Sequence, residues 1–345
     1  MGLFSSLFGK KGAAPAEEPA AEAGTDPAED LDAADGGLRV DAVRTLLERW
    51  RGGDVRAAEA LAPRLPELLE DSEPLVRTGA LSGVRLLRNP ENLAKCGSAV
   101  LALLADRVPQ VRIAAVWSAV RLPGEEARTQ VRAALRSEEE SMRFAAACAL
   151  SDAHDAAALP ELVAALGDDH RRQEALSALM SLGDASAAPQ IGKLFEQESL
   201  GAFDRTLAAA ALARLGDARG GAYLVSRIES DGDDRPIAAE WAGRLGVQEA
   251  IPALTEAAES DGDPAQGAAI RALGRLKAPG AEERLLRLAA DAEGPEDLRM
   301  DAAEGLAELA TEAALDMLGK LAAEGPPELR QLCRELLLEV QADAG

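Results

Sequence analysis

The sequence predicts an all-α protein, an α-α superhelical solenoid of stacked helix pairs with a disordered N-terminal arm. An arginine-led, alanine-rich phrase recurs along the chain at intervals of 29 to 35 residues. Self-similarity at this period is typical of stacked helical repeats, in which each unit buries its apolar face against its neighbours. No strand-like alternation is present, and aromatic residues make up only 3% of the chain. Small side chains favour thin, closely packed helical layers.

Each copy of the phrase predicts a first helix, a tight turn and a second helix. In the copy that begins at Arg205, Gly216 is placed to end the first helix and Asp217 to cap the second. We expect each repeat arginine to bond an acid or a carbonyl of a neighbouring repeat and so to fix the stacking register. Gln266 interrupts the series, which suggests that one such contact is dispensable. The repeat arginines are Arg77, Arg112, Arg143, Arg172, Arg205, Arg235, Arg299 and Arg330.

Three segments follow one another along the chain. Residues 1–11 form an apolar and then basic N-terminal hook. Residues 12–37 are rich in Ala, Pro and acidic residues, a composition that predicts a disordered acidic linker because it has little apolar surface to bury. Residues 38–345 carry the helical periodicity and predict the repeat solenoid, with about nine helical pairs plus an N-terminal pair.

The composition restricts the class of partner and the compartment. The formal net charge of −23 disfavours nucleic acid, which needs clustered cations to displace its counterions, and it favours a protein partner with a basic surface. The scattered cysteines Cys96, Cys148 and Cys333 fit the reducing cytoplasm, which is the predicted location. No apolar run is long enough to span a membrane. The composition is typical of a bacterial protein.

The phrase Arg-x-x-Ala-Ala-x-Ala-Leu-x-x-Leu-Gly-Asp, followed by a second helix such as Ala250-Ile-Pro-Ala-Leu254, resembles HEAT repeats. It is most similar to the short type first noted in phycobilisome lyases, and the resemblance covers roughly residues 72–340. It implies a right-handed solenoid of HEAT-like helix pairs whose second helices build a concave binding face. It implies no single activity, because this fold hosts scaffolds, lyases, hydroxylases and DNA-repair modules.

The predicted function is that of a non-catalytic protein-binding scaffold or adaptor. His154 and His170 fall between helices without nearby His or Cys partners, so we expect no metal site, no cofactor and no catalytic residue. The His-Glu pairs of HEAT-like di-iron hydroxylases are absent from the sequence. The alternative is a lyase-type or small-molecule-handling enzyme related to phycobilin lyases, and this alternative predicts a closed pocket with convergent polar groups.

Aromatic residues give the candidate binding site. With the repeat arginine counted as position 2, position 7 holds Trp117 in one repeat and Glu or Arg in others, which predicts an exposed position. Trp117 then either anchors a partner or packs locally against a neighbouring repeat. Phe144 falls at a variable position one repeat later and is predicted to extend a surface patch with Trp117. Trp241 falls at a small-residue position and is predicted to be core.

The N-terminal hook is the most distinctive feature outside the repeats. As a helix it would place four apolar side chains on one face, followed by two lysines. Such a short segment anchors only weakly, because ordering it costs about as much free energy as burying its side chains returns. Three alternatives stay open: weak peripheral contact of residues 2–11 with the inner face of a membrane, docking into a partner, and an inert start. The predicted anchor residues are Leu3, Phe4, Leu7, Phe8, Lys10 and Lys11.

Overall fold

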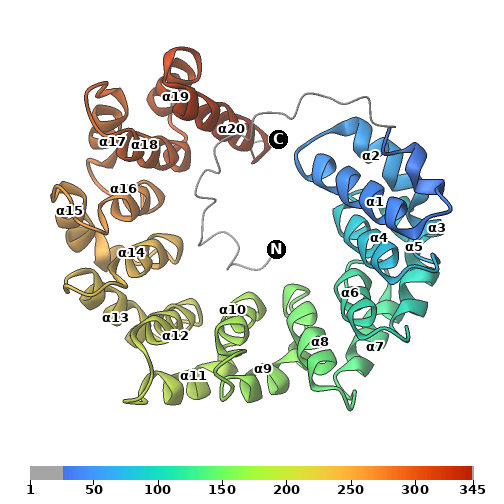
Figure 1. Cartoon of the computed structure of the whole chain (residues 1–345). Coiled ribbons are helices and arrows are strands. Elements are labelled where there is room, and N and C mark those ends of the chain that lie inside the picture. Colours follow the sequence, from blue (N-terminus) through green and yellow to red (C-terminus); the bar gives the residue numbers. More distant parts are fainter. Residues whose placement is uncertain (1–25, 344–345) are drawn as a thin grey trace. The chain divides into compact units, whose positions relative to one another are not determined.

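The computed structural model describes residues 26–343, which form helices and connecting turns without a strand (Figure 1). Contacts divide the chain into two compact units, one that ends at Asp184 and one that begins at Ala185. Each unit is a series of helix pairs, and the first helix of each repeat carries the arginine phrase. The predicted all-α architecture of stacked helix pairs is confirmed.

In the first unit, a short 3-10 helix, η2 (Glu29–Asp32), precedes the pairs. The first helices are α1 (Gly36–Arg51), α4 (Pro74–Leu86), α6 (Pro109–Ala119), α8 (Glu140–Asp152) and α10 (Arg172–Leu182). The second helices are α2 (Val55–Leu61) with η3 (Ala62–Arg64) and α3 (Leu65–Leu68), α5 (Pro90–Leu103), α7 (Glu125–Ala134), and η4 (Ala156–Ala158) with α9 (Leu159–Ala165).

The second unit opens with a second helix, η5 (Ala185–Ala187) and α11 (Ala188–Phe195). Its first helices are α12 (Ala202–Arg214), α14 (Arg235–Arg244), α16 (Gln266–Arg275), α18 (Glu296–Leu309) and α20 (Pro327–Asp343). Its other second helices are α13 (Ala218–Ile228), η6 (Gln248–Ala250) with α15 (Ile251–Glu259), α17 (Ala281–Ala290) and α19 (Glu312–Glu324). No second helix follows α20 within residues 26–343, so the copy of the phrase at Arg330 is unpaired there.

Local sequence signals set the helix ends. Gly216 adopts a φ of 83°, a left-handed conformation that glycine enters without a steric penalty, and α12 ends just before it. Asp217 then accepts a hydrogen bond from the backbone N–H of Arg219 at 3.0 Å and caps α13. Gly53 and Asp54 act in the same way between α1 and α2. The turn within these pairs is therefore encoded by two adjacent residues.

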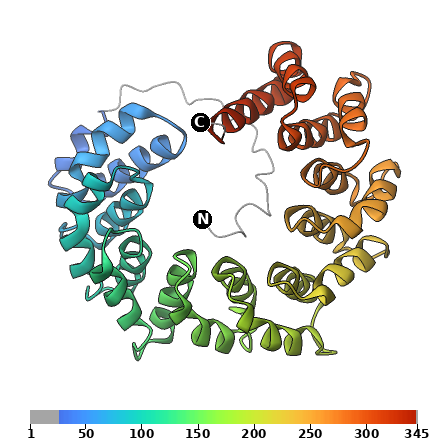
Figure 2. The ribbon, with the colours of Figure 1, turned by 180° about the vertical axis from the view of Figure 1, so that it is seen from behind.

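The helices of each unit form two layers. Consecutive first helices pack closely on one another, as α4, α6, α8 and α10 do, whereas consecutive second helices touch only sparingly. Within each unit the first helices lie on the inner side of its curve (Figure 1). Figure 2 shows the same arrangement from behind. The expectation that second helices build the concave face is therefore wrong. Alanine and glycine on the first helices allow the closer approach, and the layer with the closer approach becomes the inner one.

The repeat arginines on the first helices from α4 to α18 make one contact in common. Each of them donates to a backbone carbonyl at or just beyond the end of the preceding second helix, where carbonyls lack a helical partner. Gln266 keeps this contact, since its Nε2 donates to the carbonyl of Ala258 at 3.3 Å. On α20 the donor is Arg334, one turn after Arg330. The acceptors are the carbonyls of Asp71 for Arg77, Asp106 for Arg112, Ser137 for Arg143, Leu166 for Arg172, Leu200 for Arg205, Ile228 for Arg235 and Ala289 for Arg299.

Several of these arginines also bond an acid of the following repeat. Arg77 donates to Asp106 at 3.0 Å, and Arg235 donates to Asp263 at 2.8 Å. Arg112 reaches Glu139 in the same way. These ion pairs join one repeat to the next, while the carbonyl contacts join each first helix to the end of the second helix before it.

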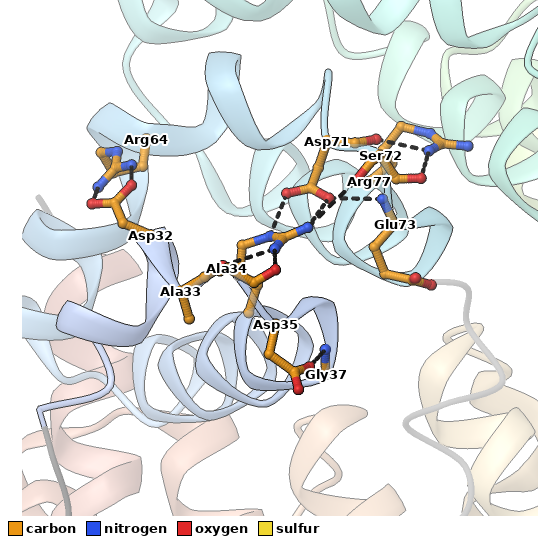
Figure 3. Close-up of polar contacts among 11 residues, drawn as sticks. Asp32, Ala33, Ala34, Asp35, Gly37, Arg64, Asp71, Ser72, Glu73 and Arg77 are labelled. Atoms are coloured by element: carbon orange, nitrogen blue, oxygen red, sulfur yellow. Dashed lines mark hydrogen bonds and ion pairs between the residues drawn. The ribbon is translucent and has the colours of Figure 1, made fainter.

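The boundary of the predicted linker differs from the structure. The composition predicts disorder up to residue 37, but Leu31 of η2 is only 2% exposed and α1 begins at Gly36. Arg39 accounts for the ordered backbone before α1, because it donates to the carbonyl of Ala33 at 2.8 Å and forms an ion pair with Asp71. Figure 3 labels both partners, Ala33 and Asp71, and marks these contacts with dashed lines. Arg39 therefore repeats the arginine contact in the first pair. The predicted hook, residues 1–11, lies outside the described residues, as does the linker up to residue 25.

Within residues 26–343, every helix is too short or too polar to cross a membrane.

The arginine contact gives a stability prediction. Arg77 and Asp106 are both nearly buried, with side-chain exposures of 7% and 9%. We expect Arg77→Ala to lower the free energy of unfolding by about 3–5 kcal/mol, because the variant leaves a buried carboxylate unpaired. Arg77→Gln keeps a donor and should cost less. Urea denaturation of the purified variants measures both.

Arg88 is the matched control, since it is exposed and lies beyond the end of α4. Its change to Ala should alter the free energy of unfolding by less than about 0.5 kcal/mol. Equal effects of Arg77→Ala and Arg88→Ala would show that the interrepeat contact contributes nothing to stability.

Candidate functional site

A cavity of about 430 Å³ opens on the first-helix layer of the first unit. It spans three consecutive first helices, α6, α8 and α10, together with the loop before α10. Its wall combines buried small residues with exposed polar ones at the rim. The lining residues are Trp117, Cys148, Ser151, Asp152, His170, Gln173, Glu174, Ser177, Ala178 and Ser181.

Position 7 of the repeat creates this hollow. Trp117 occupies it on α6, and the next two repeats place Cys148 and Ser177 there. Both of these small residues are buried, with exposures of 2% and 7%. A large side chain followed by two small ones leaves open space beside the indole ring. The prediction that position 7 is exposed holds for Glu335 on the last helix, but it is wrong for Cys148, Ser177 and Glu240, which are buried between neighbouring first helices.

Trp117 is half-buried at the cavity wall. The Arg85 guanidinium of α4 lies over its ring, 5.5 Å from the centroid, in a cation–π contact. Phe144 does not extend the surface patch predicted from the sequence. Its side chain is only 7% exposed, and the Arg171 guanidinium covers its ring at 5.5 Å. Helix α8 packs between neighbouring helices on most sides, which is why a variable position on it is still buried.

Two carboxyl groups at the rim of the cavity act on the thiol at its floor. Burial raises the pKa of the Cys148 thiol, and the carboxylates of Glu174 and Asp152 raise it further. The thiol therefore stays protonated at neutral pH, and it is a poor nucleophile for that reason. The pKa of Glu174 is also raised, because the surrounding protein partly desolvates its carboxyl group although the residue reaches the surface.

The two histidines lie in different surroundings. His154 is exposed in the turn before η4 with a φ of 53°, as expected for a loop residue. His170 is exposed too, but it lines the cavity. In the part of the chain that the structure describes, no group of three or more His, Cys, Asp or Glu side chains is placed to hold a metal ion.

On α14, α16 and α18 of the second unit, position 7 holds the long charged side chains Glu240, Arg271 and Glu304 instead of small ones. Glu240 of α14 is 7% exposed and accepts hydrogen bonds from Arg244 and Arg275. Arg271 of α16 bridges Asp301 and Glu304 of α18. These side chains fill the space that stays open in the first unit. Trp241 beside them is 1% exposed, so the prediction that it is core is correct.

The carboxyl groups of this cluster differ in pKa. Burial disfavours the ionised form of Glu240, but Arg275, Arg244 and Arg271 outweigh that effect and lower its pKa. Burial raises the pKa of Asp301 and of Glu304, and the guanidinium of Arg271 only partly compensates. The ionised form of Glu240 therefore stabilises the cluster, whereas the ionised form of Glu304 is less stable in the folded protein than in water.

Comparison with protein families agrees with this repeat geometry. A sequence model described as HEAT repeats matches residues 97–183 in the first unit and residues 251–337 in the second, half of the chain in total. The chain belongs to the HEAT-repeat family. The cavity lies within the first matched region. No curated protein has a matching sequence.

Solved structures with similar chains have varied functions. An engineered protein is 19% identical, with a TM-score of 0.37, and the match covers 91% of this chain and 97% of that chain. Human deoxyhypusine hydroxylase is 21% identical, with a TM-score of 0.31 and coverages of 72% and 97%. The CpcE–CpcF complex of phycocyanin lyase from Nostoc sp. is 19% identical, with a TM-score of 0.39 and coverages of 94% and 100%. These TM-scores are too low to support any functional argument.

The second-unit cluster gives a prediction that separates its two kinds of acid. Glu240→Ala should lower the free energy of unfolding by about 3–5 kcal/mol, because it leaves buried guanidinium groups without their shared partner. Glu304→Gln should leave the stability unchanged or raise it at pH 7, since it removes an acid whose ionised form the fold disfavours. Urea unfolding at pH 7 measures both.

The pH dependence of this stability difference tests whether the pKa of Glu304 is raised in the native protein. As the pH falls through the raised pKa of Glu304, the native protein takes up a proton and loses its disadvantage relative to Glu304→Gln. The difference between the two proteins should therefore shrink in mild acid. A difference that grows in acid would contradict the assignment.

Proposed function

We propose that this HEAT-repeat protein is a non-catalytic scaffold that binds a protein partner on the first-helix layer of its first unit. The observation that supports the proposal best is the half-buried Trp117 at the wall of a cavity in that layer. A tryptophan at the edge of a desolvated pocket is a typical anchor of protein interfaces. The acidic balance of the chain favours a partner with a basic surface.

The N-terminal hook belongs to this proposal as a weak anchor to a complex or to the inner face of a membrane. Its sequence supports the idea, with Phe4 and Phe8 followed by Lys10 and Lys11. A cytoplasmic location is part of the same proposal.

A second candidate function is the handling of a small molecule, as in a lyase-type enzyme. The cavity supports it, because about 430 Å³ falls within the range of about 300–1,000 Å³ that small-molecule pockets occupy. The raised pKa of Cys148 argues against a thiolate nucleophile at its floor. We therefore rank the scaffold first.

Affinity capture from native extract, followed by calorimetry with the purified partner, tests the scaffold. The baits are the full chain and a chain that starts at Asp26, because residues 26–37 hold η2 and the start of α1 and so belong to the folded protein. We expect one partner to bind both proteins and to dissociate as salt is added, since its complementary charges are screened.

Trp117→Ala should weaken partner binding by at least about tenfold, as expected for an interface anchor. Val55→Ala is the control, because Val55 is an exposed apolar residue of the second-helix layer, 67% exposed. Binding that tolerates Trp117→Ala as well as it tolerates Val55→Ala would overturn the proposed site. A partner lost with residues 1–25 would assign recognition to the N-terminal segment instead.

A further inference from the structure

The cavity in the first unit has a floor without bulky or basic side chains. Cys148, Ser177 and Ala178 are small and at most 7% exposed, and Trp117 forms one wall. No lysine or arginine is among the residues that line it. The space therefore accepts a side chain with an apolar stem, which packs against the indole ring and the small floor residues.

Charged groups of both signs surround this space: two acids stand at its rim, and Arg85, on which the charge of Asp152 acts, lies over Trp117. Asp152 and Glu174 stand at its exposed rim, and both reach the Cys148 thiol electrostatically. The hydroxyl of Ser181 donates to Asp152 at 3.2 Å, so this carboxylate is held in place beside the cavity. Because the lining of the cavity includes these two acids and no lysine or arginine, its rim favours a cation over an anion.

The protein's own cations leave Glu174 incompletely compensated. Arg171 is the cation that acts on it, but its guanidinium also bonds Glu140 and Asp168 and covers Phe144. Arg85 lies at the opposite wall, over Trp117. That contact shows that a guanidinium is compatible with this ring.

We propose that the cavity receives an arginine or lysine side chain of the protein partner, an inference that rests on the proposed scaffold function. The cationic group lies between Asp152 and Glu174, and its methylene stem packs on Trp117 and Cys148. Long basic side chains pair an apolar stem with a charged end, which matches a cavity with an apolar floor and an acidic rim. The proposed site thus predicts that the partner carries a basic residue whose side chain projects into the first-helix layer.

The test uses the full chain and single blocked amino acids, so it does not depend on knowing the partner. The protein holds three tryptophans, each with one indole N–H signal in a ¹⁵N NMR spectrum, and Trp117→Phe identifies the signal of Trp117. N-acetyl-arginine amide should shift that signal in a saturable way. N-acetyl-citrulline amide has nearly the same shape without the charge and should bind about fivefold more weakly, as expected for the loss of an ion pair with the rim carboxylates.

A pair of variants locates the charge. Glu174→Gln should weaken arginine binding about threefold or more, as expected for loss of a partly exposed ion pair. Glu126→Gln removes one charge from exposed α7 of the same unit and should leave binding unchanged. Equal affinities for arginine and citrulline would overturn the inference, and so would equal effects of the two variants.

The arginine-binding test and the partner-binding test can fail independently of one another. If a partner binds through Trp117 while arginine and citrulline bind alike, the scaffold stands and the basic-residue assignment falls. If arginine binds selectively while no partner is captured, the cavity is a cation site and the scaffold proposal falls.

Discussion

The structure depends on one hydrogen bond that recurs at the junctions between repeats. A long side chain near the start of each first helix from α4 to α20 donates to a carbonyl at or near the end of the second helix before it, as Arg143 does to Ser137. Carbonyls at a helix end lack an intrahelical donor, so this contact satisfies a polar group that packing would otherwise leave unpaired. It also sets how far one pair can slide along the next. Gln266 shows that the requirement is for a donor of sufficient reach and not for a charge.

Much of the fold could be predicted because its signals are local. Gly216 and Asp217 encode a turn within adjacent residues, and the repeated phrase reveals the stacking. The prediction of the linker boundary was wrong because the ordered position of Leu31 depends on contacts of Arg39 with Asp71, which lies 32 residues further on.

The prediction of the binding site was wrong for a different reason. Glu240 and Arg271 at position 7 suggested exposure, yet they are held in an ion-pair cluster that a single sequence does not show. The run of Trp117, Cys148 and Ser177 carried the signal for a hollow, but only the inner placement of first helices gives it that meaning.

The same repeat position thus has opposite uses in the two units. Small residues at position 7 leave open space beside Trp117, and long charged residues fill it between α14, α16 and α18. Burial acts on the acids in both places, but their partners differ. Glu240 has three guanidinium groups and a lowered pKa, whereas Glu174 has one shared guanidinium and a raised pKa. Full internal compensation makes a structural cluster, and incomplete compensation leaves a site able to bind a cation.

The recurrence of the arginine contact has a consequence for how such a chain changes in evolution. Because neighbouring pairs are joined by the same kind of bond, duplication or loss of one whole pair brings together a donor and a carbonyl that already match. Length is therefore free to vary in steps of one repeat. The cavity does not share this freedom, since Trp117 and Glu174 belong to helices with α8 between them. A pair inserted anywhere between α6 and α10 would separate its walls, so inheritance of the site requires these three repeats to remain consecutive.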